Sequence, residues 1–372
     1  MQRLSFEQAK GPVDVAKALV SSAVAPAAAA GFIREGDATG PVVGGFFSPG
    51  LGAPAAADGP ERVFFDLASL TKPLFAVALA KSAVDRRTPL AELLTEAVGT
   101  RSASVSLERL LSHRAGLEAN LPVFQWLREA RDEPTRLATR RSALERAADA
   151  RRPGLDGPIP DEGFPPLYSD LGYMLVGEAV ARALGKVDAG AVIEDLLVSA
   201  LGLESELGTA RGLERQGVRL GTRAAPTEDV DWRGGVIRGA VHDENAWMLT
   251  GSGGSGHAGM FGTAAAVLRF AQFVLEHRAG FPWTTARRPG GSLRAGFDGK
   301  SPEGSSAGER MGNDAFGHLG FTGTSLWIDP TLGVAVTVLS NRVHPSREST
   351  LIRSARPLAH DALVRLALEG AP

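Results

Sequence analysis

The sequence predicts an α/β (α+β) protein in which one sheet is built from both ends of the chain and a mostly helical region is inserted between them. Two observations predict this fold. Short apolar runs broken by Gly, Pro and Asp occur near both ends, as is typical of strands joined by turns. Apolar residues at helical spacing dominate the middle of the chain. We therefore expect two domains. Residues 1–84 and 245–372 form an α/β sheet domain, and residues 85–244 form a mostly helical domain inserted into it.

The first elements follow from local pattern. Residues 12–24 are mostly apolar with charges at Asp14 and Lys17, which predicts an amphipathic helix. The runs GFIREG, PVVGGFFS and ERVFFDLA then read as strands. The helical middle is predicted from the segments LTKPLFAVALAKSAV, SLERLLSH, VFQWLREARD, RLATRRSALERAADA, LGYMLVGEAVARAL and AVIEDLLVSAL. The Pro/Gly-rich stretches RRPGLDGPIPDEGFPP and TRAAPTEDVDWRGG are expected to be long surface loops.

The last third returns to strands. TAAAVLRFAQFVLEHR predicts a helix capped by Thr263, and residues 283–313 read as loop. GHLGFTGTSLWIDP and GVAVTVLSN are two β-rich runs around a turn at residues 329–333, which predicts a hairpin. A closing helix is expected over about residues 348–368.

Composition excludes several function classes. The chain has no cysteine, so disulfides, thiolate metal sites and a cysteine nucleophile are excluded, and a net charge of −2 gives no reason to expect nucleic acid as a partner. No apolar run approaches the length of a membrane span. Charges are scattered through the first residues, at Glu7, Lys10, Asp14 and Lys17, where a signal peptide would keep an unbroken apolar core. We expect a cytoplasmic protein, with a periplasmic or secreted location as the alternative.

The stretch DLASLTKPLF places Ser69 and Lys72 three residues apart, on one face of a helix. Pro73 is tolerated only in a first turn, so Ser69 is expected at the start of a helix that runs to about residue 84. The free N–H groups and positive field at a helix start suit a nucleophile and an oxyanion. The alternative is that Ser69 is an ordinary capping residue. Lysine occurs only at positions 10, 17, 72, 81, 186 and 300, so its presence in this motif is informative.

Two further motifs stand later in the chain. One of only two tyrosines lies in Tyr168-Ser169-Asp170, at a loop-to-helix junction. Its alternative reading is a helix cap with a packed ring. The third motif, His318-Leu319-Gly320, begins a strand whose glycines permit close approach of a ligand or another backbone. The alternative is an edge strand that glycine weakens and whose histidine has no functional role.

Together, and in this order, the three motifs resemble the serine β-lactamase and penicillin-binding protein superfamily, in particular its class C β-lactamase-like hydrolases and esterases. The resemblance spans about residues 60–345. It implies an antiparallel sheet flanked by helices and hydrolysis through an acyl-enzyme, with neither a metal nor an organic cofactor. The phrases that carry it are DLASLTK, RLLSHRAGL, YSDLGYMLVGEAV, VHDENA, SGHAGMFGTA, FGHLGFTGTSLWIDP and SNRVHP.

The resemblance also implies roles for residues. Ser69 would be the nucleophile, while Lys72 and Tyr168 would move its proton, either of them as the base. That chemistry calls for a lysine or tyrosinate whose pKa is lowered by a crowded, partly dry, cationic site. The backbone N–H groups of Ser69 and Phe321 would form the oxyanion hole. Further substrate contacts are expected from Asp170, His257, His318 and Gly320.

Two residues depart from the pattern of the superfamily. Asp170 stands in place of an asparagine, and its carboxylate could pair with Lys72, raise the pKa of the lysine and shift the work of the base to Tyr168. His318 stands in place of a lysine and is mostly neutral at pH 7, which weakens any anchor for a substrate carboxylate. We therefore expect an esterase, amidase or peptidase acting on a small ester, amide or peptide, and not an efficient β-lactamase.

The alternative function is a catalytically weak or silent penicillin-binding-like protein that binds peptide or cell-wall fragments. The combined presence of Ser69, Lys72 and Tyr168 favours an enzyme, because a binding protein has no need of an activated nucleophile. The remaining histidines and arginines near the motifs, such as His113 and Arg342, are expected to be structural. His242-Asp243-Glu244 lacks the spacing of a metal site.

Overall fold

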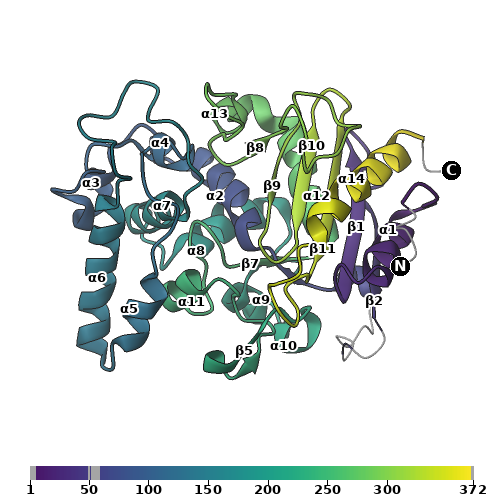
Figure 1. Cartoon of the computed structure of the whole chain (residues 1–372), viewed down its shortest axis with the longest axis horizontal. Helices are drawn as coiled ribbons and strands as arrows, with labels where there is room; N and C mark the ends of the chain where they lie inside the picture. The colour runs from purple at the N-terminus through teal and green to yellow at the C-terminus, as the bar shows by residue number, and fades with distance from the viewer. Residues whose placement is uncertain (1–5, 49–50, 52–58, 370–372) are drawn as a thin grey trace.

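A computed structural model describes residues 6–48, 51 and 59–369. Its main sheet is antiparallel and has the strand order β2-β1-β11-β10-β9-β8 (Figure 1). Strand β1 from the N-terminal end pairs with β11 from the C-terminal end, from Ala28 opposite Ser340 to Arg34 opposite Val334. The prediction of a sheet built from both ends is confirmed. Its strands are β1 (Ala27–Arg34), β2 (Val42–Phe47), β8 (Asp298–Gly299), β9 (Phe316–Leu319), β10 (Ser325–Asp329) and β11 (Val334–Ser340).

Helices cover both faces of this sheet, because its central strands are apolar at nearly every position. Ala28 and Phe32 of β1 pack toward α1 and α14, whereas Ala29 and Ile33 pack toward α12. Successive side chains of a strand point to opposite faces, so one strand contributes to two cores. The covering helices are α1 (Pro12–Ser21), α12 (Ala264–His277) and α14 (Ile352–Glu369). Thr263 caps α12 as predicted, accepting from the Ala266 N–H.

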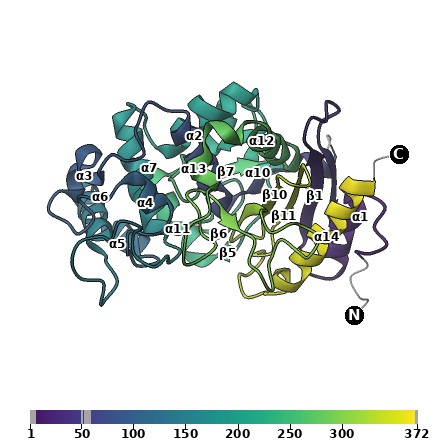
Figure 2. The same ribbon diagram turned by 90° about the horizontal axis from the view of Figure 1, so that it is seen from above.

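The region between the sheet segments is mostly helical and lies at the other end of the molecule from α1 and α14 in both views (Figures 1 and 2). Its helices are α3 (Leu90–Leu93), α4 (Leu107–Leu111), α5 (Val123–Glu129), α6 (Glu133–Asp149), α7 (Asp170–Ala183), α8 (Ala189–Ile193), α9 (Ala210–Arg215), α10 (Leu220–Arg223) and α11 (Glu244–Thr250). Two small sheets join it, made of β3 (Phe65–Asp66), β7 (Met260–Gly262) and β4 (Leu207–Thr209), and of β5 (Asp229–Val230) and β6 (Gly235–Val236). Among the described residues, no helix combines the length and the apolar composition that a membrane span requires.

Several element boundaries differ from the prediction: the first helix, α1, ends at Ser21 and not at residue 24, and the closing helix, α14, begins at Ile352 and not near residue 348. Helix α2 (Thr71–Ala80) ends before residue 84, because the Ser82 hydroxyl donates to the Leu79 carbonyl and competes with further helical bonding. The run GHLGFTGTSLWIDP is two strands and not one, since Gly323 at φ +108° turns the chain between β9 and β10. The expected loop at 283–313 begins at the end of α13 (Pro282–Thr285) and contains β8.

The nucleophile segment lies where the sheet meets the helical region. A 3₁₀ turn, Ala68–Leu70, follows β3 and leads directly into α2. Two side chains from the β9–β10 turn hold this segment: the Thr322 hydroxyl donates to the Asp66 carbonyl at 2.7 Å, and the Thr324 hydroxyl donates to the Leu67 carbonyl at 3.0 Å. Ser69 is therefore fixed against the edge of β9.

Candidate active site

Ser69 and Lys72 face each other as their spacing predicts. The 3₁₀ turn and α2 form one continuous helical path, so residues three apart share a face. The Lys72 ammonium is fully buried and donates to the Ser69 hydroxyl at 2.8 Å and to the His257 carbonyl at 3.3 Å. A lysine in this position can exchange a proton with the serine.

The turn before Ser69 is strained and is held by a buried carboxylate. Ala68 has φ +47°, a conformation that residues with a Cβ rarely adopt. The Asp66 carboxylate accepts from the Ala68 N–H at 2.8 Å and from the His242 N–H at 2.7 Å. Burial raises the pKa of Asp66 to about 6, against the opposing effect of those two N–H groups. The sequence analysis missed this role for Asp66, whose only local signal is an acidic residue two positions before a helical turn.

Tyr168 reaches the same site from the loop before α7. The side chains of Lys72 and Ser69 interact with its hydroxyl and act to lower its pKa, and the Lys72 Nζ lies 4.9 Å from the centre of its ring. The ring of His113 stacks on Tyr168 with centroids 4.8 Å apart, and His113 Nδ1 accepts from the Ser169 N–H at 3.0 Å. Burial holds the pKa of His113 well below its usual value, so this ring is a neutral acceptor that supports the tyrosine.

Asp170, the first residue of α7, forms the expected pair with Lys72, with 2.7 Å between Oδ1 and Nζ. Burial is the largest single effect and would lower the pKa of Lys72, but Asp170 and Tyr168 together outweigh it and the net pKa is raised. Burial also raises the pKa of Tyr168, although the Lys72 cation opposes it. The expectation that one of these bases has a lowered pKa is therefore wrong, because Asp170 supplies the negative charge that keeps Lys72 protonated.

Strand β9 forms the opposite wall. His318 is buried, its Nδ1–H donates to the Leu319 carbonyl at 2.9 Å, and burial together with the Lys72 charge lowers its pKa to about 3. The ring is thus neutral throughout the physiological range, and not merely mostly neutral at pH 7. Gly320 has no room for a side chain, because a Cβ would lie 1.9 Å from Thr324 Oγ1 and 2.6 Å from the Leu67 carbonyl oxygen.

His257 does not reach the cavity, contrary to expectation. Its ring is buried behind Asp243, with Nε2 donating to Asp243 Oδ1 at 3.0 Å and the Ser255 hydroxyl 3.0 Å from Nδ1. Burial alone would raise the pKa of Asp243, but the His257 ring holds it below its usual value. The part of His257 that contacts the site is its carbonyl group, which accepts from Lys72.

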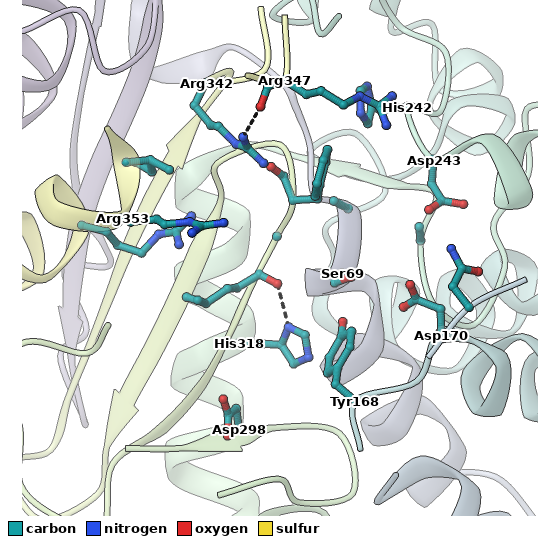
Figure 3. Close-up of a pocket in the computed structure, with 18 of the residues that line it drawn as sticks. Ser69, Tyr168, Asp170, His242, Asp243, Asp298, His318, Arg342, Arg347 and Arg353 are labelled. Carbon is teal, nitrogen blue, oxygen red and sulfur yellow. Dashed lines mark hydrogen bonds between the residues drawn. The ribbon is translucent and has the colours of Figure 1, made fainter. Parts of the chain in front are cut away.

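These side chains open onto a cavity of about 570 Å³ (Figure 3). Ser69, Tyr168, Asp170 and His318 line it on the side of the motifs. The other wall carries arginines, of which the sequence analysis considered only Arg342, and as a structural residue. They come from α14 and the segment before it: Arg342, Arg347, Arg353 and Arg356. Asp243 and the half-exposed ring of Phe321 complete the rim.

The low pKa of His318 predicts how acid affects stability. An unfolded histidine binds a proton below about pH 6.5 while the buried ring does not, so stability falls as the pH falls through that window. Between pH 7 and pH 5 this group should cost about 2 kcal/mol of unfolding free energy. His318→Gln should remove that loss, measured by urea unfolding at the two pH values. An equal loss in wild type and variant would show that His318 is not held neutral.

Comparisons with known proteins agree with this arrangement. The protein-family model described as Beta-lactamase matches residues 15–360. The chain is 28% identical over 198 residues to N-acetylmuramyl-L-alanine amidase of Bacillus subtilis (strain 168), covering 48% of this chain and 44% of that protein. It is 28% identical over 204 residues to a putative D-alanyl-D-alanine carboxypeptidase of Salmonella heidelberg (strain SL476), covering 48% of this chain and 45% of that protein. The match therefore spans less than half the length of these curated relatives.

A solved structure gives the same fold over nearly the whole chain. The class C β-lactamase from Rhodobacter sphaeroides superposes with a TM-score of 0.67, covering 97% of this chain and 100% of that one at 17% sequence identity. The mixed α/β arrangement, with an antiparallel sheet flanked by helices, is the β-lactamase and transpeptidase fold.

Proposed function

The chain belongs to the Beta-lactamase family, and from that premise we propose that it is a serine hydrolase that cleaves a small ester, amide or peptide bond through an acyl-enzyme on Ser69. The observation that carries the proposal is the 2.8 Å contact between Lys72 Nζ and Ser69 Oγ at a cavity large enough for a small substrate. The two curated relatives are named as an amidase and a putative carboxypeptidase, which supports amide and peptide bonds.

In the proposed first step Lys72 passes a proton to Asp170 across their 2.7 Å contact and then accepts the proton of Ser69. The transfer to Asp170 is needed because Lys72 is an ammonium in the free site. The Ser69 oxygen bonds to the substrate carbonyl carbon, and the negative charge on the carbonyl oxygen is stabilised by the backbone N–H groups of Ser69 and Phe321.

Collapse of that intermediate breaks the bond to the leaving group. Tyr168, a neutral phenol, gives its proton to the leaving atom and is reprotonated by Lys72, which recovers its own proton from Asp170. Water then attacks the acyl-enzyme by the same route and releases the acid. Acylation moves the Ser69 proton to the leaving group, and in deacylation the water gives its OH to the acyl carbon and its proton to Ser69, so every side chain returns to its starting state.

We place β-lactam hydrolysis below ester, amide and peptide hydrolysis in this proposal. The neutral His318 leaves its end of β9 without the cation that a lysine would supply for a carboxylate beside the scissile bond. The second candidate function, a weak or silent peptide-binding protein, is favoured by one observation: Asp170 keeps Lys72 protonated and so opposes activation of Ser69.

The proposal predicts that a fluorophosphonate probe labels Ser69, detected as a single adduct by intact mass and located by peptide mapping. Ser69→Ala should remove the label, whereas Ser82→Ala, at the end of the same helical segment, should retain it. The labelled protein should also lose hydrolysis of a nitrophenyl ester. A wild-type protein that binds the ester but neither takes the label nor turns the ester over would favour the silent binding protein.

A further inference from the structure

The wall opposite Ser69 carries a cluster of positive charge at the start of α14. Thr350, Ile352, Arg353 and Arg356 all line the cavity, and the first turn of α14 has no acidic residue. The N-terminus of a helix carries a partial positive charge that favours acidic side chains and disfavours arginine. Two arginines there raise the energy of the free protein, and an anion bound between them would lower it.

Arg356 is the most constrained member of the cluster. It is only 6% exposed, its Nε is buried without a hydrogen-bond partner, and its Nη2 donates to the Thr324 carbonyl at 3.3 Å. Within the described residues it forms no ion pair. Burial, together with the neighbouring Arg342, lowers the pKa of Arg356 to about 10. A buried guanidinium without a carboxylate is costly unless a ligand supplies the negative charge.

Arg342 is fixed beside it by its own backbone contacts. Its Nε donates to the Phe321 carbonyl at 2.9 Å, its Nη1 donates to the carbonyls of Arg347 and Ser349, and its guanidinium lies 4.6 Å from the centre of the Phe321 ring. These contacts leave Nη2 available. Burial and the charge of Arg353 lower the pKa of Arg342, and both side chains line the same cavity.

Arg347 and Arg353 differ in their partners. Arg347 is neutralised by Glu228 at 2.5 Å and by Glu244 at 2.6 Å. Arg353 is exposed and has no ion pair among the residues that the structure describes, and Figure 3 shows its side chain extending from α14 toward the cavity. Three unneutralised guanidinium groups therefore share one wall of the cavity: Arg342, Arg353 and Arg356.

We propose that Arg342, Arg353 and Arg356, with the N-terminus of α14, form a subsite for a doubly charged anionic group of the substrate, of which a phosphate monoester is the compact form. The inference rests on the proposed function, because it places this group on a substrate whose scissile bond lies at Ser69. The free donors are Arg342 Nη2, Arg356 Nη1 and the whole guanidinium of Arg353, which is enough for three phosphate oxygens. A single carboxylate would leave two of the three cations uncompensated.

The subsite can be tested with three acetate esters that differ only in charge: 3-carbamoylphenyl acetate, 3-carboxyphenyl acetate and 3-(phosphonooxy)phenyl acetate. At constant low ionic strength, kcat/KM of the wild type should rise in that order, by about tenfold at each charge. Arg353→Gln and Arg356→Gln should each reduce the differences in kcat/KM among the three esters, while kcat/KM for the neutral ester stays nearly unchanged. Arg365→Gln is the matched control, because Arg365 lies on α14 away from the cavity and pairs with Glu369.

The outcomes separate this inference from the proposed function. If the neutral ester is turned over but the three esters react alike, the subsite is rejected while the hydrolase stands. Equal rates for the carboxylate and phosphate esters would reject a doubly charged ligand. If no ester is turned over, the proposal of a hydrolase is rejected. The subsite is then tested alone by calorimetric titration of the Ser69→Ala variant with phenyl phosphate. The double variant Ser69→Ala/Arg353→Gln should bind phenyl phosphate more weakly. If the Arg356→Gln variant does not fold, the Arg353→Gln variant still tests the subsite, because Arg353 is exposed.

Discussion

Replacing Lys72 by methionine is expected to lower kcat/KM for ester hydrolysis by about three orders of magnitude. Lys72 is the side chain whose amine contacts the Ser69 hydroxyl, and methionine fills its buried site without a group that can carry a proton. The same change leaves the partly buried Asp170 without its cation, so the free energy of unfolding should also fall. Steady-state kinetics and urea unfolding measure the two effects.

The double variant Lys72→Met/Asp170→Asn separates the chemical loss from the structural one. Removing both charges should recover most of the stability but none of the activity. In Asp170→Asn alone, loss of the carboxylate lets burial lower the pKa of Lys72, so the acidic limb of the profile of kcat/KM against pH should move to lower pH. Wild-type activity in the double variant would show that Lys72 only packs beneath the nucleophile.

Gly320→Ala is expected to lower kcat about a hundredfold and to destabilise the protein by about 1–3 kcal/mol. The new Cβ would overlap Thr324 Oγ1 and the Leu67 carbonyl oxygen, two atoms whose hydrogen bond joins the β9–β10 turn to the nucleophile segment. β9 would have to move away from Ser69, and the two backbone N–H groups proposed for the oxyanion hole would separate.

Gly221→Ala, on α10, is the matched control, because a Cβ there meets no atom within 4 Å. It should leave both kcat and stability nearly unchanged. If Gly320→Ala retained wild-type kcat with an ordinary KM, then β9 would not form the wall of the reacting site, and the proposed oxyanion hole would have to be abandoned.

Features set by local pattern could be predicted from the sequence. The spacing of Ser69 and Lys72 places them on one face whatever the rest of the chain does, and the Thr263 cap depends only on the N–H three residues later. The sheet from both ends was predictable because the β-rich runs lie at the two ends and the helical pattern lies between them. Asp170 could be paired with Lys72 because the resemblance placed both at one site.

Features that depend on contacts between distant segments could not be predicted. Asp66 is important because it bonds to the N–H of His242, and the arginine wall exists because α14 returns to the cavity after the last strand. The ring of His257 faces away from the site because Ser255 and Asp243 hold it, which its glycine-rich sequence does not reveal. The pKa of His318 follows from burial beside Lys72, which no short motif encodes.

The pairing of β1 with β11 has a consequence for synthesis of the protein on the ribosome. Ala27 N–H donates to Asn341, 314 positions further along the chain, so β1 is made long before β11, its central partner. Until then the nascent chain carries an apolar strand edge with no partner, which other chains can join. Ser69 also lacks its β9 wall during that time. The proposed site is therefore assembled only after β9 and β11 have been made and have folded against the segment that carries Ser69 and against β1.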